Sequence, residues 1–245
     1  MAENFWDEPE RSGDGGDLTL SLLGVAAAPP DDDGSLRIEI RTTRGAINGI
    51  LHPVEGGTGA VVCVGGALGG FDGPADGLYG DLPALLADDA ISVLRLTYRF
   101  PENFEESVLD VLAGCSFLKG IGATDLVLVG HSFGAAVVIK AGALHDLVRA
   151  VASLSPQLYG TRQVQDLGRP LLLVHGMSDT VLDHAASEDV YARAREPKRM
   201  VLYAEAGHSL VQARNELRTL LPGWIRDRLA GRPMDGGREE IDWAG

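Results

Sequence analysis

Residues 125–144 read DLVLVGHSFGAAVVIKAGAL, and this stretch decides the fold. The near-continuous apolar run Asp125–Val129 is typical of a strand in a sheet that is covered on both faces. The segment Ser132–Leu144 continues as a helix. Between the two, Gly130 and Gly134 flank the serine at a distance of two residues, so that strand and helix can approach each other closely. We therefore predict a sharp strand–turn–helix bend with Ser132 at its tip.

The alternation of strands and helices continues on both sides of this bend. Strands are predicted at residues 36–40, 46–51, 60–64, 91–97, 125–129, 150–154, 170–175 and 199–203. Helices are predicted at residues 79–88, 103–118, 132–144, 185–195 and 209–229. Strands that alternate with helices form βαβ units, so we expect an α/β fold with a mostly parallel central sheet and helices on both faces.

Two residues downstream of Ser132 are candidates for activating its hydroxyl, which is a weak nucleophile without a general base. Asp179 follows strand 170–175, and His208 follows strand 199–203. Catalytic groups of open α/β sheets gather at the carboxyl ends of strands, so we expect Ser132, Asp179 and His208 to form a triad. Asp183 competes as the acid, but Asp179 lies nearer the end of its strand.

These residues also allow less specific interpretations than a triad. Ser132 could simply cap a helix, and His131 and His175 are expected to be structural. A metal site formed by His175, Asp179 and His208 would leave Ser132 without a role. The sequence has no GxGxxG at a first strand and no Walker loop, so we expect neither a metal nor a cofactor.

Negative charge that develops on a carbonyl oxygen during catalysis needs backbone N–H donors. We expect one from Phe133, directly after the serine, and one from Ala67 in the glycine-rich loop 65–70, with Gly66 as the alternative. Arg99 ends a strand near the site and could hold a substrate carboxylate or form an ion pair. The expected walls of the substrate site are mainly apolar: Leu68, Phe71, Phe133, Leu158, Tyr159, Leu182 and Leu210.

Four motifs occur in a fixed order: the glycine-rich loop 65–70, GHSFG at 130–134, HGMSD at 175–179 and AGH at 206–208. With these motifs, the chain resembles the α/β-hydrolase superfamily from about residue 36 to residue 230. The HGMSD motif is similar to that of the dienelactone-hydrolase-like and peptidase-like members. The resemblance implies the α/β-hydrolase fold.

In three features this chain differs from one or another group of proteins within that superfamily. Gly65 replaces the usual histidine of the oxyanion loop. Ser132 stands where dienelactone hydrolases proper usually carry cysteine, so their lactone substrate is not expected. The connection from Leu154 to Pro170 is too short for the helical cap of many members, so we expect an open site without a cap domain.

The bulk composition excludes several other classes of protein. A formal net charge of −14 disfavours binding to nucleic acid or to anionic membranes. The two cysteines form neither a disulfide framework nor a zinc-binding spacing, which favours the cytoplasm. Residues 18–28 imitate a signal peptide, but the acidic residues 1–17 lack the basic start that such a peptide needs.

Taken together, these observations predict one hydrolase domain at residues 18–230, between an acidic flexible tail at 1–17 and a polar, glycine-rich flexible tail at 231–245. We expect a serine hydrolase that cleaves a carboxylic ester or thioester of a small acyl substrate through an acyl-enzyme on Ser132. An acyltransferase with the same triad and a non-catalytic binding protein of the same fold are the alternatives. A peptidase is conceivable, although no further domain gates the site.

Overall fold

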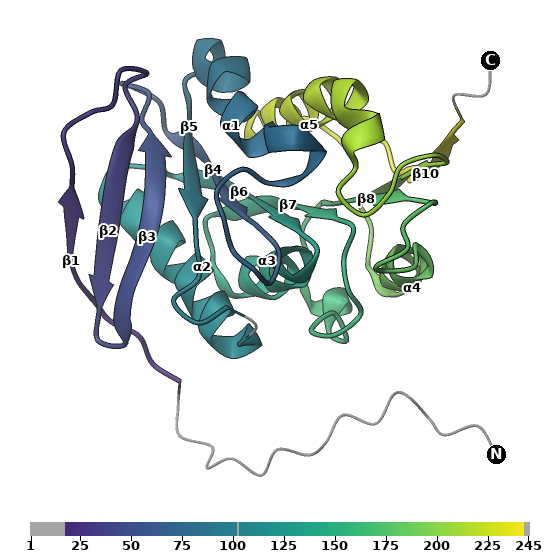
Figure 1. The fold of residues 1–245 in the computed structure, drawn as a ribbon, viewed down its shortest axis with the longest axis horizontal. Coiled ribbons are helices and arrows are strands. Elements are labelled where there is room, and N and C mark those ends of the chain that lie inside the picture. The colour runs from purple at the N-terminus through teal and green to yellow at the C-terminus, as the bar shows by residue number, and fades with distance from the viewer. Residues whose placement is uncertain (1–17, 102, 243–245) are drawn as a thin grey trace.

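The computed structural model describes residues 18–101 and 103–242. These residues form one ten-stranded sheet in the order β1-β2-β3-β5-β4-β6-β7-β8-β9-β10 (Figure 1). The strands are β1 (Leu22–Ala27), β2 (Leu36–Thr42), β3 (Gly45–His52), β4 (Gly59–Val64), β5 (Ile91–Leu96), β6 (Asp125–His131), β7 (Val148–Leu154), β8 (Leu171–Gly176), β9 (Lys198–Tyr203) and β10 (Gly237–Ile241). The pairs from β1 to β5 along this order are antiparallel, and all pairs from β5 to β10 are parallel. The predicted mostly parallel sheet is therefore confirmed.

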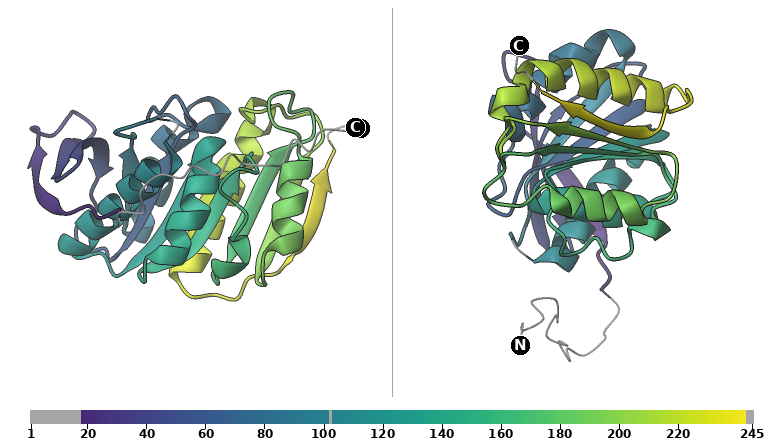
Figure 2. Two further views of the ribbon diagram at one scale, coloured as in Figure 1. Left: turned by 90° about the horizontal axis from the view of Figure 1, so that it is seen from below. Right: turned by 90° about the vertical axis from the view of Figure 1, so that its right-hand side faces the viewer.

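Helices cover both faces of this sheet, as the sequence predicts. The helices are α1 (Pro74–Leu86), α2 (Phe104–Gly120), α3 (Phe133–Leu144), α4 (Ala185–Arg193) and α5 (Arg214–Leu229). Helices α1 and α5 pack together on one face, and α2, α3 and α4 lie on the other (Figures 1 and 2). The central strands are thus buried between two helical layers, which explains their continuous apolar sequences.

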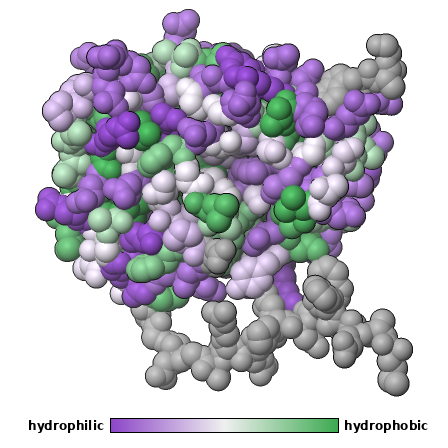
Figure 3. All heavy atoms as spheres, viewed as in Figure 1, coloured by the Kyte–Doolittle hydropathy of each residue, from purple (hydrophilic) through white to green (hydrophobic). Residues whose placement is uncertain are grey.

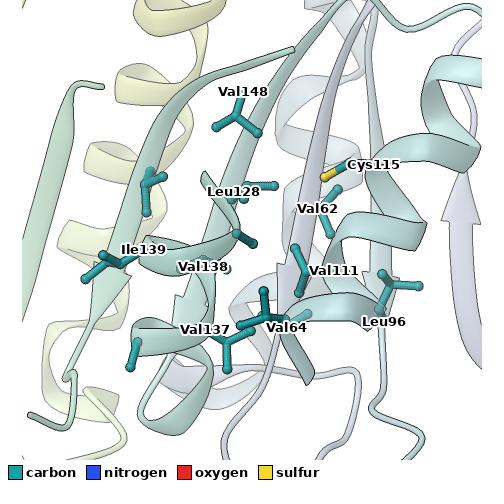
Figure 4. Packing of buried hydrophobic residues seen from close by; sticks show 14 of the residues in the cluster. Val62, Val64, Leu96, Val111, Cys115, Leu128, Val137, Val138, Ile139 and Val148 are labelled. Atoms are coloured by element: carbon teal, nitrogen blue, oxygen red, sulfur yellow. The ribbon is translucent and has the colours of Figure 1, made fainter. Parts of the chain in front are cut away.

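The core divides into two clusters because successive side chains of a strand point to opposite faces. In β4, Val62 and Val64 pack toward α2 and α3, while Val61 and Cys63 pack toward α1 and α5. Figure 4 shows the first cluster, where valines of α3 lie over β4 and β6. The visible surface is different, since hydrophobic residues appear there as separate spots among hydrophilic ones (Figure 3). The packing therefore anchors the ends of the central strands, from which the candidate site residues extend.

Two strands at the edges of the sheet were not expected from the sequence. β1 pairs antiparallel with β2, although nearly all of its residues are exposed. β10 lies in the segment 231–245, where a flexible tail is predicted from the sequence, and it pairs parallel with β9. That prediction is wrong for residues 237–241, because main-chain pairing and an ion pair between Arg199 and Glu239 hold them without an apolar pattern. The tail predicted at residues 1–17 lies outside the described residues.

The connection between β7 and β8 decides whether the site is covered from above. Within residues 155–170 the regular structure is a single turn of 3-10 helix, Val164–Asp166. The expectation of a fold without a cap domain is therefore confirmed. Among the described residues, no helix combines the length and the apolar character needed to cross a membrane.

Candidate active site

Ser132 stands on a strained bend between β6 and α3. Its backbone has φ 58° and ψ −119°, a region that residues other than glycine rarely adopt. A β-carbon on Gly130 would lie 2.1 Å from the carbonyl oxygen of Gly134, and one on Gly134 would lie 2.3 Å from that of Gly65. The Ser132 N–H donates to Leu154 O at the end of β7, at 2.8 Å. The bend thus requires glycine on both sides and is tied to the neighbouring strand.

The side chains of Ser132, His208 and Asp179 form one hydrogen-bonded chain. His208 Nε2 lies 3.0 Å from Ser132 Oγ, and His208 Nδ1 lies 2.7 Å from Asp179 Oδ2. The three residues extend from the carboxyl ends of β6, β9 and β8. The carboxylate can only accept on this side, so Nδ1 carries the proton and Nε2 is free to accept from the serine hydroxyl. The predicted residues therefore come together in the order that nucleophile activation needs.

Asp179 rather than Asp183 reaches the imidazole. Its side chain is fully buried, and its Oδ1 accepts from the N–H groups of Val181 and Leu182 at 2.8 and 2.9 Å. Burial alone would raise the pKa of Asp179, but these N–H donors and His208 outweigh it and lower the pKa below its usual value. Asp183 is 80% exposed and accepts from an N–H at the start of α4 instead.

The backbone of His208 is held by two neighbouring side chains. His131 Nε2 and Ser155 Oγ both donate to the carbonyl oxygen of His208, at 2.9 and 3.1 Å. Burial lowers the pKa of His131 to about 4, so its ring is neutral at physiological pH. The loop after β9 is thereby fastened to the bend that carries Ser132.

The glycine-rich loop after β4 approaches Ser132 from the side. A β-carbon on Gly66 would lie 3.8 Å from Ser132 Oγ. The amide of Ala67, and that of Phe133 at the start of α3, donate no hydrogen bond to any residue that the structure describes. A β-carbon on Gly65 would lie only 2.9 Å from Gly69 O, so this conformation of the loop leaves no room for a side chain at this position.

Two buried tyrosines fix the orientation of this loop. The Tyr79 hydroxyl donates to Val64 O at 3.1 Å, and the Tyr98 hydroxyl donates to Gly65 O at 3.0 Å. Burial raises the pKa of both phenols, so both remain protonated donors. The peptide groups at the end of β4 therefore have fixed directions.

The expected walls of the substrate site have different surroundings. Leu68 is 95% exposed and Tyr159 is 50% exposed, while partial burial is found for Phe71, Leu158 and Leu182. Phe133 is buried and packs edge-on against Tyr98. Leu210 was predicted wrongly, because its backbone has φ 55° and its side chain is fully buried in the cluster beneath α1 and α5.

Arg99 is not available to a substrate carboxylate. Its side chain is 2% exposed and pairs with Asp110 and with Glu106. Of the two roles considered for it, the ion pair is therefore the one observed, although it is buried rather than superficial. No three His, Cys, Asp or Glu side chains within residues 18–101 and 103–242 are arranged to hold a metal ion.

Comparison with known proteins adds evidence on the fold. The sequence pattern of one family, described as serine aminopeptidase, S33, matches residues 159–215, a segment that carries Asp179 and His208. No curated protein matches the sequence. Est1E from Butyrivibrio proteoclasticus is similar in structure with a TM-score of 0.67 and 17% identity, over 79% of this chain and 99% of that chain. Dienelactone hydrolase from Anabaena variabilis has a TM-score of 0.68 and 17% identity, over 80% and 98% of the two chains. The chain has the α/β-hydrolase fold.

A serine hydrolase homologue of the same fold from Coxiella burnetii has a TM-score of 0.66 and 20% identity, over 76% of this chain and 95% of that one. The α/β-hydrolase fold accounts for the shared edge on which Ser132, Asp179 and His208 lie, because all three follow parallel strands.

Several polar residues hold Ser132, Asp179 and His208 in place, and not all of them can be found from the sequence. His131 and His175 were identified as structural, but their contacts with His208 and Asp179 were not anticipated. Ser155 donates to His208 O, and the Ser187 hydroxyl lies 2.7 Å from His175 Nδ1. Neither serine gave a signal in the sequence, because a serine that follows a strand or lies in a helix has no distinctive pattern. Their partners become evident only when separate elements are brought together.

Proposed function

We propose that this chain is a serine hydrolase that cleaves a carboxylic ester or thioester of a small substrate through an acyl-enzyme on Ser132. The observation that carries the proposal is the continuous chain of hydrogen bonds from Ser132 Oγ through His208 to Asp179. A binding protein would gain nothing from a strained serine aligned with an imidazole and a buried carboxylate. Esterases and a dienelactone hydrolase are among the proteins of similar structure, which agrees with this reaction class.

Each residue has one role in the reaction that we infer. His208 Nε2 takes the hydroxyl proton while Ser132 Oγ forms a bond to the carbonyl carbon of the substrate. Asp179 orients the imidazole and stabilises its charged form. His208 then gives the proton to the departing alcohol or thiol as its bond to the acyl carbon breaks. Water, deprotonated by His208 in the same way, attacks the acyl-enzyme and releases the acid and the free serine.

The oxyanion donors that we propose are the N–H groups of Phe133 and Ala67. The preference for Ala67 over Gly66 rests on the Tyr98 contact. Tyr98 and the start of α3 lie on the side of the loop to which the Gly65 carbonyl points. The Gly66 N–H belongs to the same trans peptide and therefore points to the opposite side. The next amide along the loop, that of Ala67, is the better placed donor.

The class of substrate follows from the surroundings of the site. Leu68, Tyr159 and Val181 are exposed apolar side chains in the loops after β4, β7 and β8. Arg99, the cation expected nearby, is already paired with acids. These features favour a small uncharged acyl group. The net charge of −14 supports the absence of nucleic-acid and membrane partners, and the free thiols support a cytoplasmic location.

Active-site labelling tests this proposal directly. The purified full-length chain is treated with a fluorophosphonate probe, and the modified peptide is mapped by mass spectrometry. We expect labelling at Ser132, and the Ser132→Ala variant is expected to lose at least ~10³-fold in kcat on p-nitrophenyl esters while its circular dichroism is unchanged. Ser116→Ala, which changes an exposed serine of α2, is the matched control. Unlabelled Ser132, or wild-type turnover in Ser132→Ala, would rule out the proposal.

A further inference from the structure

A second histidine lies behind the carboxylate of Asp179. His175 is the penultimate residue of β8 and is fully buried. Its Nε2 lies 3.1 Å from Asp179 Oδ2, the same oxygen that His208 Nδ1 contacts at 2.7 Å. Two imidazoles from neighbouring strands therefore share one carboxylate oxygen.

The partners of His175 determine where its proton resides. Nε2 also lies 3.0 Å from the carbonyl oxygen of Leu182, and neither a carbonyl nor a carboxylate can donate. Nε2 must therefore carry the proton. Nδ1 lies 2.7 Å from the hydroxyl of Ser187, a fully buried residue of α4, which can donate to it. Burial lowers the pKa of His175, in agreement with a neutral ring in this tautomer.

The contacts of Leu182 close a loop around the carboxylate. Its N–H donates to Asp179 Oδ1, while its carbonyl accepts from His175. His175 thus holds both Asp179 and the segment that orients Asp179. Each oxygen of the carboxylate is engaged by two donors, which fixes the side chain in the direction of His208.

We propose that His175 is a positioning residue of the triad, with Ser187 as the donor to its Nδ1. The inference rests on the proposed function, since it assigns His175 a role in the same reaction. The Nε2–H bond holds Asp179 in line with His208 and withdraws charge from the oxygen that faces His208. A histidine that only fills space in the core would do neither.

Two substitutions of His175 distinguish a positioning role from a role that only fills space in the core. His175→Gln keeps an N–H donor near the position of Nε2, whereas His175→Leu keeps the bulk and removes the donor. We expect kcat to fall about 10–100-fold in His175→Leu with little change in KM, and His175→Gln to recover most of the loss. Two folded variants with wild-type kcat would overturn the proposal, and so would equal losses in both.

The pH dependence gives a readout that packing alone would not change. The titratable groups that face His208 are Asp179, His175 and His131. Loss of the His175 donor leaves more negative charge on Asp179 Oδ2, which stabilises the protonated form of His208. The acid limb of the kcat/KM profile is therefore expected to move to higher pH in His175→Leu but not in His175→Gln. An unmoved limb in the leucine variant would contradict the proposal.

Nitrogen-15 NMR of the histidine rings keeps this test independent of the ester reaction. We expect His175 in the Nε2–H tautomer in the wild-type chain, and a shift of the His208 ring-nitrogen resonances in His175→Leu but not in His175→Gln. If these shifts occur in a protein with no hydrolase activity, the proposed function fails and the positioning contact stands. An Nδ1–H tautomer in the wild-type chain would overturn the inference.

A milder variant covers the case in which His175→Leu does not fold. Ser187→Ala removes the donor to Nδ1 and is expected to shift the acid limb in the same direction, by a smaller amount. Ser153→Ala, which removes a buried hydroxyl bonded to Ala135 O, is the matched control and should leave the profile unchanged. A Ser187→Ala variant with the wild-type pH profile would also contradict the inference.

Discussion

At the scale of single residues, Asp179 and Asp183 show how little separates a buried acid from a solvated one. Both lie in the loop between β8 and α4, four positions apart. Asp179 is surrounded by N–H donors and keeps its negative charge when buried, because those donors replace the water it loses. Asp183 remains in water and accepts from the Ala185 N–H at the start of α4. Only the first can hold an imidazole in one orientation.

The first prediction compares amide substitutions at these two positions. Asp179→Asn is expected to lower kcat by about 10⁴-fold, because the amide cannot hold the tautomer of His208 that accepts the serine proton. Asp183→Asn is the matched control and is expected to retain turnover. Kinetics on a p-nitrophenyl ester check both variants. Similar losses in the two, or a larger loss in Asp183→Asn, would show that the acid has been misassigned.

The candidate triad was predictable from the sequence, because its members follow apolar strands in an order that a parallel sheet brings to one edge. Leu210 was not predictable, because the direction of its side chain depends on its own positive φ angle, two residues after His208. Ser155 and Ser187 were not predictable either. Each makes a hydrogen bond to a residue of another segment of the chain, and no spacing along the sequence predicts such a contact.

At the scale of elements, the bend between β6 and α3 depends on close approach of backbones. The space beside Gly134 is occupied by the carbonyl of Gly65 and the hydroxyl of Tyr98. These are the atoms that hold the glycine-rich loop in place. A side chain at Gly134 would therefore disturb the bend and the glycine-rich loop at the same time.

The second prediction places the same substitution in two helices. Gly134→Ala is expected to lower the free energy of unfolding by about 1–3 kcal/mol or more, since its β-carbon would meet backbone at 2.3 Å. Gly223→Ala, in α5, has open space around the new β-carbon and is expected to raise that free energy by up to about 1 kcal/mol. Urea unfolding measures both. A neutral Gly134→Ala would show that the bend can relax.

Most elements could be predicted because buried strands and helices leave distinct apolar patterns, but helix starts were less accurate. The last helix was expected from Ser209 and begins at Arg214, after a 3-10 turn at Val211–Ala213. Leu210 adopts a left-handed conformation, which is incompatible with a right-handed helix, so the helix can begin only after this residue. That conformation serves the tertiary packing of the histidine loop, which local sequence does not reveal.

At the scale of the whole molecule, the sheet contains two more strands than the apolar pattern of the sequence predicts. β1 and β10 lie at its two edges, where one or both faces meet water. Edge strands are held by main-chain hydrogen bonds, so their side chains need not alternate or be apolar. The central strands position the candidate site, and their apolar runs made that part of the architecture predictable.

Burial of histidines throughout the molecule makes its stability depend on pH. The pKa values of His52, His131, His145 and His175 are all lowered, first of all by burial. In the unfolded chain these rings take up protons near pH 6.5, whereas in the folded chain they do so only at lower pH. The unfolded state therefore binds more protons below pH 6.5, and the free energy of unfolding decreases as the pH falls.

The third prediction isolates the contribution of one ring to this dependence. The pKa of His131 is lowered from 6.5 to about 4, which corresponds to a loss of up to about 3 kcal/mol of stability between those two pH values. His131→Gln can still donate to the carbonyl of His208 but cannot take up a proton. Urea unfolding at pH 7 and at pH 4.5 should therefore give a smaller difference for His131→Gln than for the wild-type chain. His184→Gln, at a partly exposed ring beside Asp183, is the control and should keep the wild-type difference. If His131→Gln kept it as well, the acid sensitivity would arise from the other buried rings and from the carboxylates, and His131 would be less buried in solution than its contacts imply.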